Sequence, residues 1–446
     1  MKIVIAGAGE VGFHLARMMT KEAQDIVVID KNKERLRYIE SHIDVITIRG
    51  DASSPKVLDE ARAETADLLI SVTDSETNNF CIAILGKKFG AKKTIARITN
   101  TNIFQYKDRI DLDSLGIDAL VSTEDLAAQE IKSLIEHSAF TDSFDFEGGK
   151  LRLLGIHLDE SSDIIDKSIM ETASLNPKLS FMPVAIQRGD VTLIPRGTTV
   201  LRQGDHVYFV AQEAGEGEVI RLTGKKHFDI RNIMILGGGS IGVKSSLILS
   251  DKYKIKLIEQ NKNRCYELAD ILPKTMILNG DGRNVELLEE ENIENMDAFI
   301  AVTGNSETNI MSCLVAKKHG VKKTIALVEN MDYIHLSQEI GIDTLINKKL
   351  LAVSSIFKFL RQGQVISIAN LHGVDAEILE FEVNFGAKIT EKPIRELEFP
   401  KDAIIGGVVR NGKGYMTMGD FQLQPHDRVV VFTLPAAIHK VESFFK

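Results

Sequence analysis

Short apolar runs alternate with amphipathic segments in the first part of the chain. The runs at 3–5 and 25–30 (DIVVID) read as buried strands, and Val11, Leu15 and Met18 recur between them at helical spacing. Further strands are predicted at 45–48, 68–72 and 94–98, with a helix over 81–90. Strands that alternate with helices predict a parallel sheet covered by helices on both faces.

The same alternation returns in the second half of the chain, where KKTIA at 92–96 recurs at 322–326. Its strand-like runs end at Glu259, Asp281 and Thr303, and a further run spans 323–330. The number of residues that separates the two copies is the length of a whole domain. The repeat therefore indicates gene duplication and not a solenoid of short repeats.

The segment between the two copies has a different pattern of apolar and turn-forming residues. Short strands are predicted at 151–158, 181–187 and 206–211, separated by Gly, Asp and Pro turns, which indicates a compact β-rich domain. This pattern is also repeated, because 187–205 matches 409–427. We therefore predict an α/β chain with two Rossmann-like parallel-sheet lobes, each followed by a smaller β-rich α+β domain.

This order divides the chain into lobes, β-rich domains and connecting helices. The Rossmann-like lobes are placed at 1–122 and 230–347, the β-rich domains at 144–226 and 365–446, and the connecting helices at 123–143 and 348–364. Thr123 is expected to cap the first connecting helix. Each helix is expected to pack on its own domain, and the alternative is a crossover helix used for dimerisation. The polar stretch 224–227 is the expected linker between the halves.

Each Rossmann-like copy opens with a Gly-x-Gly-x-x-Gly loop between its first strand and its first helix. Gly7 would permit a tight turn, Gly9 would let the backbone approach a pyrophosphate, and Gly12 would let helix and strand pack closely. Strand-to-helix packing alone is the alternative explanation, and it is stronger for the second copy. The candidate cofactor-binding residues of the two loops are Gly7, Ala8, Gly9, Glu10, Val11 and Gly12, and Gly237, Gly238, Gly239, Ser240, Ile241 and Gly242.

An acid ends the second strand of each copy. Asp30 follows Gly12, and Glu259 follows Gly242, close to the offset of about 20 residues expected for an acid that accepts hydrogen bonds from ribose hydroxyls. An acid at this place disfavours a 2′-phosphate, an exclusion that Lys31 and Lys33 soften a little. The pattern favours NAD(H), or ATP or ADP, over NADP(H).

Polar residues at the ends of later strands are further candidates for the nucleotide site. Asp51 and Asp281 each follow a Gly, where a carboxylate could face the adenosine, although an Asx turn explains them equally well. Thr73 and Thr303 open loops that lead into helices, so their hydroxyls and the carboxylate of Asp74 are candidates for the crevice wall. Ordinary helix capping is the alternative for this segment.

One charged position separates the two copies. Arg97 stands where the second copy has Leu327. If Arg97 reaches a phosphate, the first site has a charge-assisted contact of ~1.5–3 kcal/mol that the second lacks. We therefore predict tighter nucleotide binding by the first copy, and a salt bridge at the sheet edge is the alternative role of Arg97.

No motif in the sequence supports catalysis or metal binding. Gly238, Ser240 and Gly242 form the GxSxG pattern of hydrolases, but Ser240 aligns with Glu10 and the glycines already belong to the nucleotide turn. Walker A, HExxH and CxxC motifs are missing, and the 11 His residues are scattered. The β-rich domains offer no convincing acid or base for hydride transfer. We predict a non-enzyme, with an NAD-dependent oxidoreductase as the alternative.

Composition limits the partners and the location. With 54 Lys and Arg against 63 Asp and Glu, the net charge is −9, which argues against nucleic acid as a partner. Three widely spaced Cys residues form no disulfide framework, which fits a reduced cytoplasm. No stretch approaches the ~20 apolar residues of a membrane span, and the N-terminus has no signal-peptide pattern, so we expect a cytoplasmic protein.

Several motifs resemble the RCK (KTN) domain, which regulates potassium channels and transporters. They are IAGAGEVG at 5–12, Asp30, GDAS at 50–53, TDSETNN at 73–79 and ARITN at 96–100. The β-rich domains resemble RCK C-terminal domains, so the resemblance covers nearly the whole chain. The second copy departs from the pattern at Gly282, Arg283 and Leu327, which puts ligand binding there in doubt.

The resemblance implies binding of NAD(H) and of ATP or ADP at Gly7, Gly9, Gly12, Asp30, Thr73 and Arg97. It also implies a homo-oligomeric ring, a tetramer, at the inner face of the cell membrane beneath a potassium transporter of the Trk type. We therefore expect a regulatory subunit that gates potassium uptake in response to nucleotide. A nucleotide sensor with another client is the alternative.

Overall fold

The computed structural model describes residues 1–446 except 21–24, 100–102, 104–105, 107–108, 190, 226–227, 330–340, 361–364, 371–373 and 375. The chain forms two compact units. The first unit comprises Met1–Ala128 with Asn347–Leu360, and the second comprises Gln129–Ile346 with Arg361–Lys446. The expected linker at 224–227 lies partly outside the described residues.

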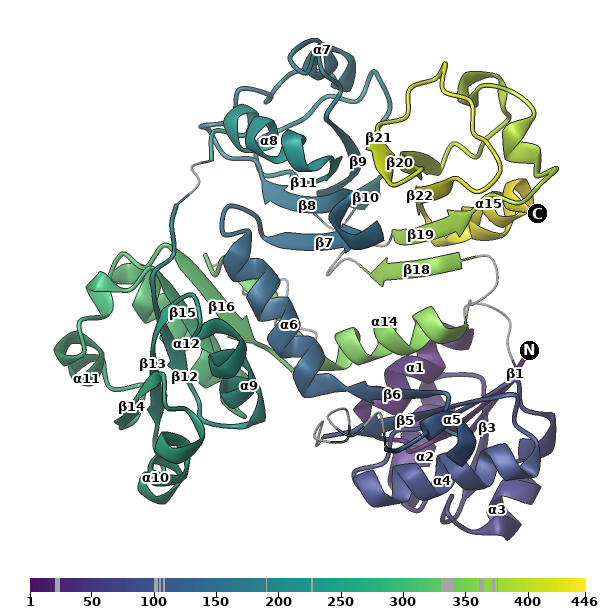
Figure 1. Cartoon of the computed structure of the whole chain (residues 1–446), viewed down its shortest axis with the longest axis vertical. Helices are drawn as coiled ribbons and strands as arrows, with labels where there is room; N and C mark the ends of the chain where they lie inside the picture. The colour runs from purple at the N-terminus through teal and green to yellow at the C-terminus, as the bar shows by residue number, and fades with distance from the viewer. Residues whose placement is uncertain are drawn as a thin grey trace. The chain divides into compact units, whose positions relative to one another are not determined.

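A six-stranded parallel sheet forms the centre of the first unit (Figure 1), with strand order β3-β2-β1-β4-β5-β6. Its strands are β1 (Lys2–Ala6), β2 (Asp25–Asp30), β3 (Ile46–Arg49), β4 (Leu68–Ser71), β5 (Lys93–Ile98) and β6 (Ala119–Ser122). Its helices are α1 (Glu10–Thr20), α2 (Lys33–His42), α3 (Pro55–Glu60), η1 (Ala63–Thr65), α4 (Glu76–Phe89) and α5 (Leu112–Leu115). This strand order is that of a Rossmann fold, as the alternation in the sequence predicts.

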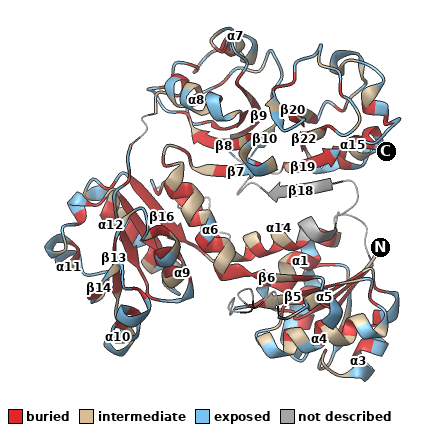
Figure 2. Ribbon diagram, in the orientation of Figure 1, coloured by how far each residue is buried: buried red, intermediate tan, exposed pale blue. Residues whose placement is uncertain are grey.

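Burial explains why these strands are apolar throughout. Ile3, Val4 and Ile5 of β1 are completely buried, and Figure 2 shows the central strands as buried while the helices expose one face. Parallel strands that are covered on both faces need apolar side chains at every position. The apolar runs of the sequence are therefore the buried centre of the sheet.

The connecting helix of the second half belongs to the first unit. This helix, α14 (Lys348–Leu360), packs against α1 and β6. Ala352, Val353 and Ile356 are buried along one face. The expectation that each connecting helix packs on its own domain is therefore wrong for α14. Its amphipathic pattern requires a buried face but does not say which lobe covers it.

The first connecting helix, α6 (Thr123–Glu136), is shorter than expected. It ends at Glu136, and β7 already begins at Asp142. The backbone N–H of Asp125 donates to Ser122 Oγ at 3.2 Å, so Ser122 and not Thr123 supplies the capping hydroxyl. The cap therefore lies one residue earlier than predicted.

The second unit contains a second parallel sheet of the same order, β14-β13-β12-β15-β16-β17. Its strands are β12 (Asn232–Leu236), β13 (Lys254–Glu259), β14 (Thr275–Asn279), β15 (Ala298–Ala301), β16 (Lys323–Leu327) and β17 (Thr344–Ile346). Its helices are α9 (Ser240–Leu249), α10 (Lys262–Ile271), α11 (Val285–Glu290), η5 (Ile293–Asn295) and α12 (Ser306–Lys318). The predicted duplication of a Rossmann-like lobe is confirmed.

Two antiparallel five-stranded sheets complete the second unit, with orders β10-β9-β11-β8-β7 and β18-β19-β22-β20-β21. The first contains β7 (Asp142–Phe146), β8 (Leu151–His157), β9 (Phe181–Arg188), β10 (Val191–Leu193) and β11 (His206–Ala211), with η3 (Glu147–Gly149), α7 (Ile169–Ser174), η4 (Glu213–Gly215) and α8 (Glu216–Leu222). The second contains β18 (Val365–Asn370), β19 (Glu377–Glu382), β20 (Ala403–Arg410), β21 (Lys413–Tyr415) and β22 (Arg428–Thr433), with η6 (Lys388–Thr390), η7 (Ile394–Glu396), η8 (Pro435–Ala437) and α15 (Ile438–Phe445). The β-rich repeat of the sequence is thus also confirmed.

A repeated ion pair accounts for part of the β-rich sequence match. Arg188 donates from Nε and Nη2 to the two carboxylate oxygens of Asp205 at 2.7 and 2.8 Å. Arg410 does the same to Asp427, at 2.7 Å for both bonds. Each Asp is 1% exposed, so its charge needs this partner in both copies.

Within the described residues, no helix has the length and apolar character that crossing a membrane requires.

Candidate functional site

A cleft of about 330 Å³ opens beside β1 and β4 in the first unit. The strand order of the sheet reverses between these two strands, which is where open α/β sheets bind their ligands. The lining residues are Gly7, Gly9, Ile29, Asp30, Lys31, Asn32, Arg35, Gly50, Asp51, Ala52, Val72, Thr73, Asp74, Ser75, Asn78 and Ile82. Six of the residues singled out in the sequence are among them: Gly7, Gly9, Asp30, Asp51, Thr73 and Asp74.

Two glycines of the first loop are required by its geometry. Gly7 has φ +115°, and a Cβ on it would lie 2.9 Å from the carbonyl carbon of Val72. A Cβ on Gly12 would lie 1.9 Å from the carbonyl oxygen of Gly7, so α1 packs directly on the turn. Gly9 is different, because a Cβ there would meet only Arg35 Nη1, at 3.8 Å. The backbone at Gly9 is therefore open towards the cleft.

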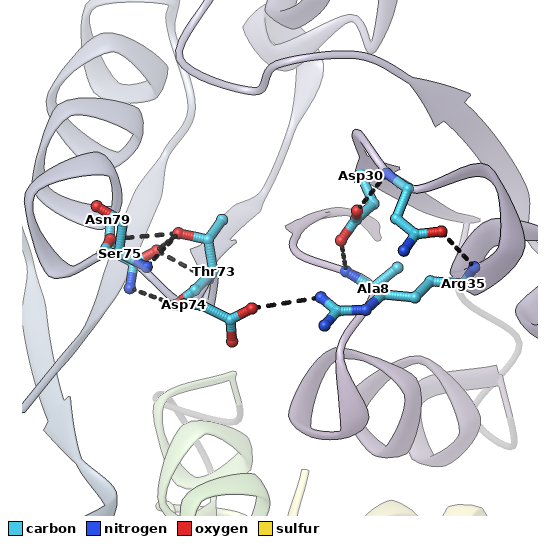
Figure 3. Close-up of polar contacts among 8 residues, drawn as sticks. Ala8, Asp30, Arg35, Thr73, Asp74, Ser75 and Asn79 are labelled. Atoms are coloured by element: carbon cyan, nitrogen blue, oxygen red, sulfur yellow. Dashed lines mark hydrogen bonds and ion pairs between the residues drawn. The ribbon is translucent and has the colours of Figure 1, made fainter.

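Asp30 is fixed at the end of β2 by two backbone hydrogen bonds (Figure 3). The N–H of Ala8 donates to Asp30 Oδ2 at 2.6 Å, and the N–H of Asn32 donates to Oδ1 at 2.7 Å. Each carboxylate oxygen keeps a further lone pair. Asp30 therefore orders the glycine loop and can still accept hydrogen bonds from ribose hydroxyls.

Asp51 combines both roles that its sequence position suggests. Its carboxylate accepts the backbone N–H of Ser53 at 3.0 Å, as in an Asx turn, and it also lines the cleft. Lys31 Nζ lies 2.9 Å from Asp51 Oδ2. Hydrogen bonds from Ser53 and Lys31 lower the pKa of Asp51 to about 2, so it is ionised at neutral pH. The charge of Lys31 is thus balanced by Asp51 and is less available to a 2′-phosphate.

Thr73 is held by Asn79, a buried residue that is not among the candidates predicted from the sequence. The Thr73 hydroxyl donates to Asn79 Oδ1 at 2.6 Å, and Asn79 Nδ2 donates to the carbonyl oxygen of Arg97 at 2.9 Å. Ser75 Oγ accepts from the N–H of Asn78 and caps α4. An Asn at the same place after each Thr was a signal in the sequence, since Asn309 follows Thr303 as Asn79 follows Thr73.

Arg35 is a second residue of the cleft that was not predicted from the sequence. It extends from α2 across the opening, and its Nη1 lies 3.4 Å from Asp74 Oδ2 (Figure 3). Both side chains are largely exposed, so this ion pair is weak and a ligand can replace it. Arg97, in contrast, lies on β5 and is not among the residues that line the cleft. A contact from Arg97 to phosphate stays a prediction.

The glycine loop of the second lobe has the same backbone conformation, but a side chain packs more closely against it. Gly237 has φ +112°, and a Cβ on Gly242 would lie 1.9 Å from the carbonyl oxygen of Gly237. The N–H of Gly238 donates to Glu259 Oε2 at 2.9 Å, as Ala8 does to Asp30. A Cβ on Gly238, where the first loop carries Ala8, would lie only 2.5 Å from Leu268 Cδ1. Leu268 therefore crowds the second loop.

In the second lobe, the acid at the end of the third strand pairs with a residue close to it in sequence, and not with one across the cleft. Asp281 accepts the N–H of Arg283 at 3.0 Å and pairs with its guanidinium, Nη2 to Oδ2 at 2.6 Å. Arg264 Nε donates to the carbonyl oxygen of Gly238 at 3.3 Å. Thr303 keeps its bond to Asn309, at 2.6 Å. The helix that follows is capped by Asn305.

The remaining candidate residues of the two glycine loops lie at the starts of helices. Ser240 and Ile241 begin α9, as Glu10 and Val11 begin α1. Ser240 is exposed at a helix start, consistent with its alignment to Glu10 and not with a nucleophile elbow. No group of three or more His, Cys, Asp or Glu residues that could hold a metal ion occurs in the described part of the chain.

Known proteins resemble this chain over its whole length. The TrkA-N domain model matches residues 3–123 and 233–348, and the TrkA-C domain model matches 153–224 and 378–446. The Trk system potassium uptake protein TrkA of Halomonas elongata is 32% identical over 451 residues, covering 100% of this chain and 99% of that protein.

Two solved structures share the fold at low sequence identity. The GsuK channel bound to NAD has a TM-score of 0.62 at 14% identity, covering 100% of this chain and 78% of that chain. GsuK bound to ADP has a TM-score of 0.51 at 13% identity, covering 81% of this chain and 69% of that chain.

Proposed function

Because the chain belongs to the TrkA family of Trk system potassium uptake proteins, we propose that it is a nucleotide-binding regulatory subunit that gates a membrane potassium transporter of the Trk type. It acts from the cytoplasmic face as a peripheral subunit. A ring of several copies, a tetramer, multiplies the effect of each bound nucleotide. Even a tenfold preference of the ligand for one state supplies only ~1.4 kcal/mol per site, so several sites must add.

The observation that carries this proposal is the placement of Asp30 in the first cleft. Its carboxylate is held by Ala8 and Asn32 at the end of β2, beside the open backbone of Gly9 at the start of α1. An acid for ribose and a helix start for phosphate are the two contacts that an adenine nucleotide needs. The cleft therefore suits an unphosphorylated adenosine ribose.

The proposed ligands are NAD(H) and ATP or ADP. The GsuK structures with a similar fold are bound to NAD in one case and to ADP in another, which supports this class of ligand. The ion pair between Lys31 and Asp51 supports the choice of NAD(H) over NADP(H). We propose no catalytic role, and the alternative of an oxidoreductase would appear as turnover of NADH by the purified protein.

Potassium flux is the direct test. A Trk-type transporter is reconstituted with this protein in vesicles, and flux is measured while ATP, ADP, NAD or NADH is varied. We expect at least one nucleotide to change the flux, and Asp30→Asn to raise the concentration required by about tenfold, because a charge-assisted hydrogen bond is lost. A flux that responds to none of these nucleotides contradicts the proposal.

A further inference from the structure

Lys349 forms an ion pair with Glu10 at the glycine loop of the first lobe. Glu10 is the first residue of α1 and directly follows Gly9. Lys349 lies far away in the sequence, in the first turn of α14, directly after the last strand of the second lobe. A residue from the second half of the chain therefore contacts the phosphate-binding segment of the first half.

The position of Lys349 is well defined. Asn347 Oδ1 accepts the backbone N–H of Lys349 at 3.0 Å and that of Leu350 at 3.2 Å, which fixes the start of α14. The buried face of α14 then holds the helix against α1. Because the start of α14 is fixed and the Lys349 side chain is only 10% exposed, the ammonium group is held beside the loop.

The two charges have unequal surroundings. The Lys349 side chain is 10% exposed, whereas that of Glu10 is 66% exposed. Burial lowers the pKa of Lys349, so this ammonium depends on an anion for its stability. Glu10 supplies that anion, but as a mostly hydrated carboxylate it can turn towards water at little cost. A phosphate at the start of α1 would compete with Glu10 for the same ammonium.

We propose that Lys349 is a specificity-determining residue of the first cleft, which exchanges Glu10 for the terminal phosphate of a nucleoside di- or triphosphate. The inference rests on the proposed function, since it assigns a ligand preference to the same cleft. A terminal phosphate carries more charge than the diester phosphates of a dinucleotide. Lys349 therefore favours ADP and ATP over NAD(H), and it links their binding to α14.

The link to α14 gives the exchange a structural consequence. The chain runs from β17 of the second lobe into α14 and then towards β18 of the second β-rich domain. A change of partner at Lys349 alters a contact that anchors the start of this helix. Occupancy of the first cleft is thereby coupled to a segment of the second half.

Calorimetric titration of the full chain with ADP and, separately, with NAD tests the inference. The background is Gly239→Asp, which blocks the second loop where a Cβ meets no atom within 4 Å. We expect Lys349→Met to weaken ADP binding about tenfold and NAD binding less than twofold. Lys349→Arg should retain the preference for ADP, and Glu10→Gln should strengthen ADP binding several-fold because it releases the ammonium.

Controls separate ligand recognition from helix packing. Arg17→Gln removes an exposed cation from the same helix α1 and should leave both affinities unchanged. Equal weakening of ADP and NAD by Lys349→Met, or weaker ADP binding in Glu10→Gln, would mean that the ion pair only anchors α14, and would overturn the inference. If Lys349→Met does not fold, Glu10→Gln decides alone. Wild-type protein that binds neither ligand contradicts the proposed function itself.

Discussion

Beside the glycine loop, the first Rossmann lobe has ion pairs that join different structural elements, whereas the pair at the matching place in the second lobe joins near neighbours in sequence. Lys31 after β2 contacts Asp51 after β3, at 2.9 Å. In the second lobe Asp281 instead pairs with Arg283, two residues away. When the two copies are aligned on their glycine loops, Asp74, the partner of Arg35, corresponds to Gly304. A pair that spans a cleft can be rearranged by a ligand, and a local pair cannot transmit such a change.

The two copies also differ in charge at the starts of their connecting helices and of their first lobe helices. Lys349 is the second residue of α14, and the second residue of α6 is Glu124. Glu10 begins α1, and Ser240 begins α9. The second position of the connecting helix is thus a cation in α14, where it contacts the first loop, and an acid in α6. We infer that the first loop has kept the ligand site and that the second mainly completes the fold.

Charge also distinguishes the two β-rich domains. In the first, His157 and His206 lie opposite each other on β8 and β11, with ring centroids 4.0 Å apart. The matching positions on β19 and β22 are Glu382 and Arg428. The first pair consists of two imidazole rings, whereas the second consists of a carboxylate and a guanidinium. The two β-rich domains therefore differ in side-chain chemistry at one matching place, as the two lobes do.

The largest expected effect comes from blocking one loop at a time. Gly9→Asp and Gly239→Asp each add a carboxylate where a Cβ has room, so neither should disturb the fold. We expect Gly9→Asp to weaken nucleotide binding by the full chain at least about 100-fold, because like charges at a phosphate site cost several kcal/mol. Gly239→Asp should change the affinity of the tighter site less than twofold.

Calorimetry on the two full-length variants makes this comparison with a matched control. Equal losses from the two substitutions would show that the loops are equivalent ligand sites. That result would contradict the asymmetry inferred from Lys31, Arg35 and Lys349. Thermal unfolding of each variant checks that the substitutions leave the lobes folded.

The sequence predicted the lobes and much of the first cleft because these depend on local patterns. The apolar run of β1, the turn at Gly7 and the acid at Asp30 are all set within one βαβ unit. The placement of α14 could not be predicted, since an amphipathic helix shows that one face is buried but not which surface covers it. Arg35 was missed for a similar reason, because its role depends on how α2 directs it across the opening towards Asp74.

A smaller effect is expected from making the first copy resemble the second at one position. Arg97→Leu introduces the residue found at Leu327. The carbonyl of Arg97 is bound by Asn79, which also holds Thr73 in the cleft wall, so its side chain begins next to the cleft without lining it. We expect Arg97→Leu to weaken NAD binding about tenfold through loss of a phosphate contact.

Arg97→Lys serves as the control because it keeps the charge and loses the planar donor geometry. It should retain part of the affinity in the same calorimetric titration. Unchanged NAD binding in Arg97→Leu would mean that the guanidinium does not reach the ligand. The difference between the lobes would then rest on Asp74, Lys31 and Lys349.

The smallest effect concerns pH and the β-rich domains. Burial and the neighbouring His206 and Lys225 lower the pKa of His157 to about 4, against an opposing effect of Asp142. In the unfolded chain His157 is protonated below about pH 6.5, whereas in the folded chain it stays neutral down to about pH 4. The contribution of His157 to the free energy of unfolding is therefore highest above pH 6.5 and decreases as the pH falls towards 4. We expect a loss of about 1–2 kcal/mol at pH 5 for the first β-rich domain.

Hydrogen exchange locates this loss, since protection factors can be compared between β8 and β11 on one side and β19 and β22 on the other. Between pH 7 and pH 5, protection of β8 and β11 should fall about tenfold more than that of β19 and β22. His157→Phe should remove this difference, because an uncharged ring takes up no proton in either state. Glu382→Gln, at the matching position, should leave it in place. An equal fall in both sheets of the wild-type protein would show that the histidine pair does not distinguish the two halves.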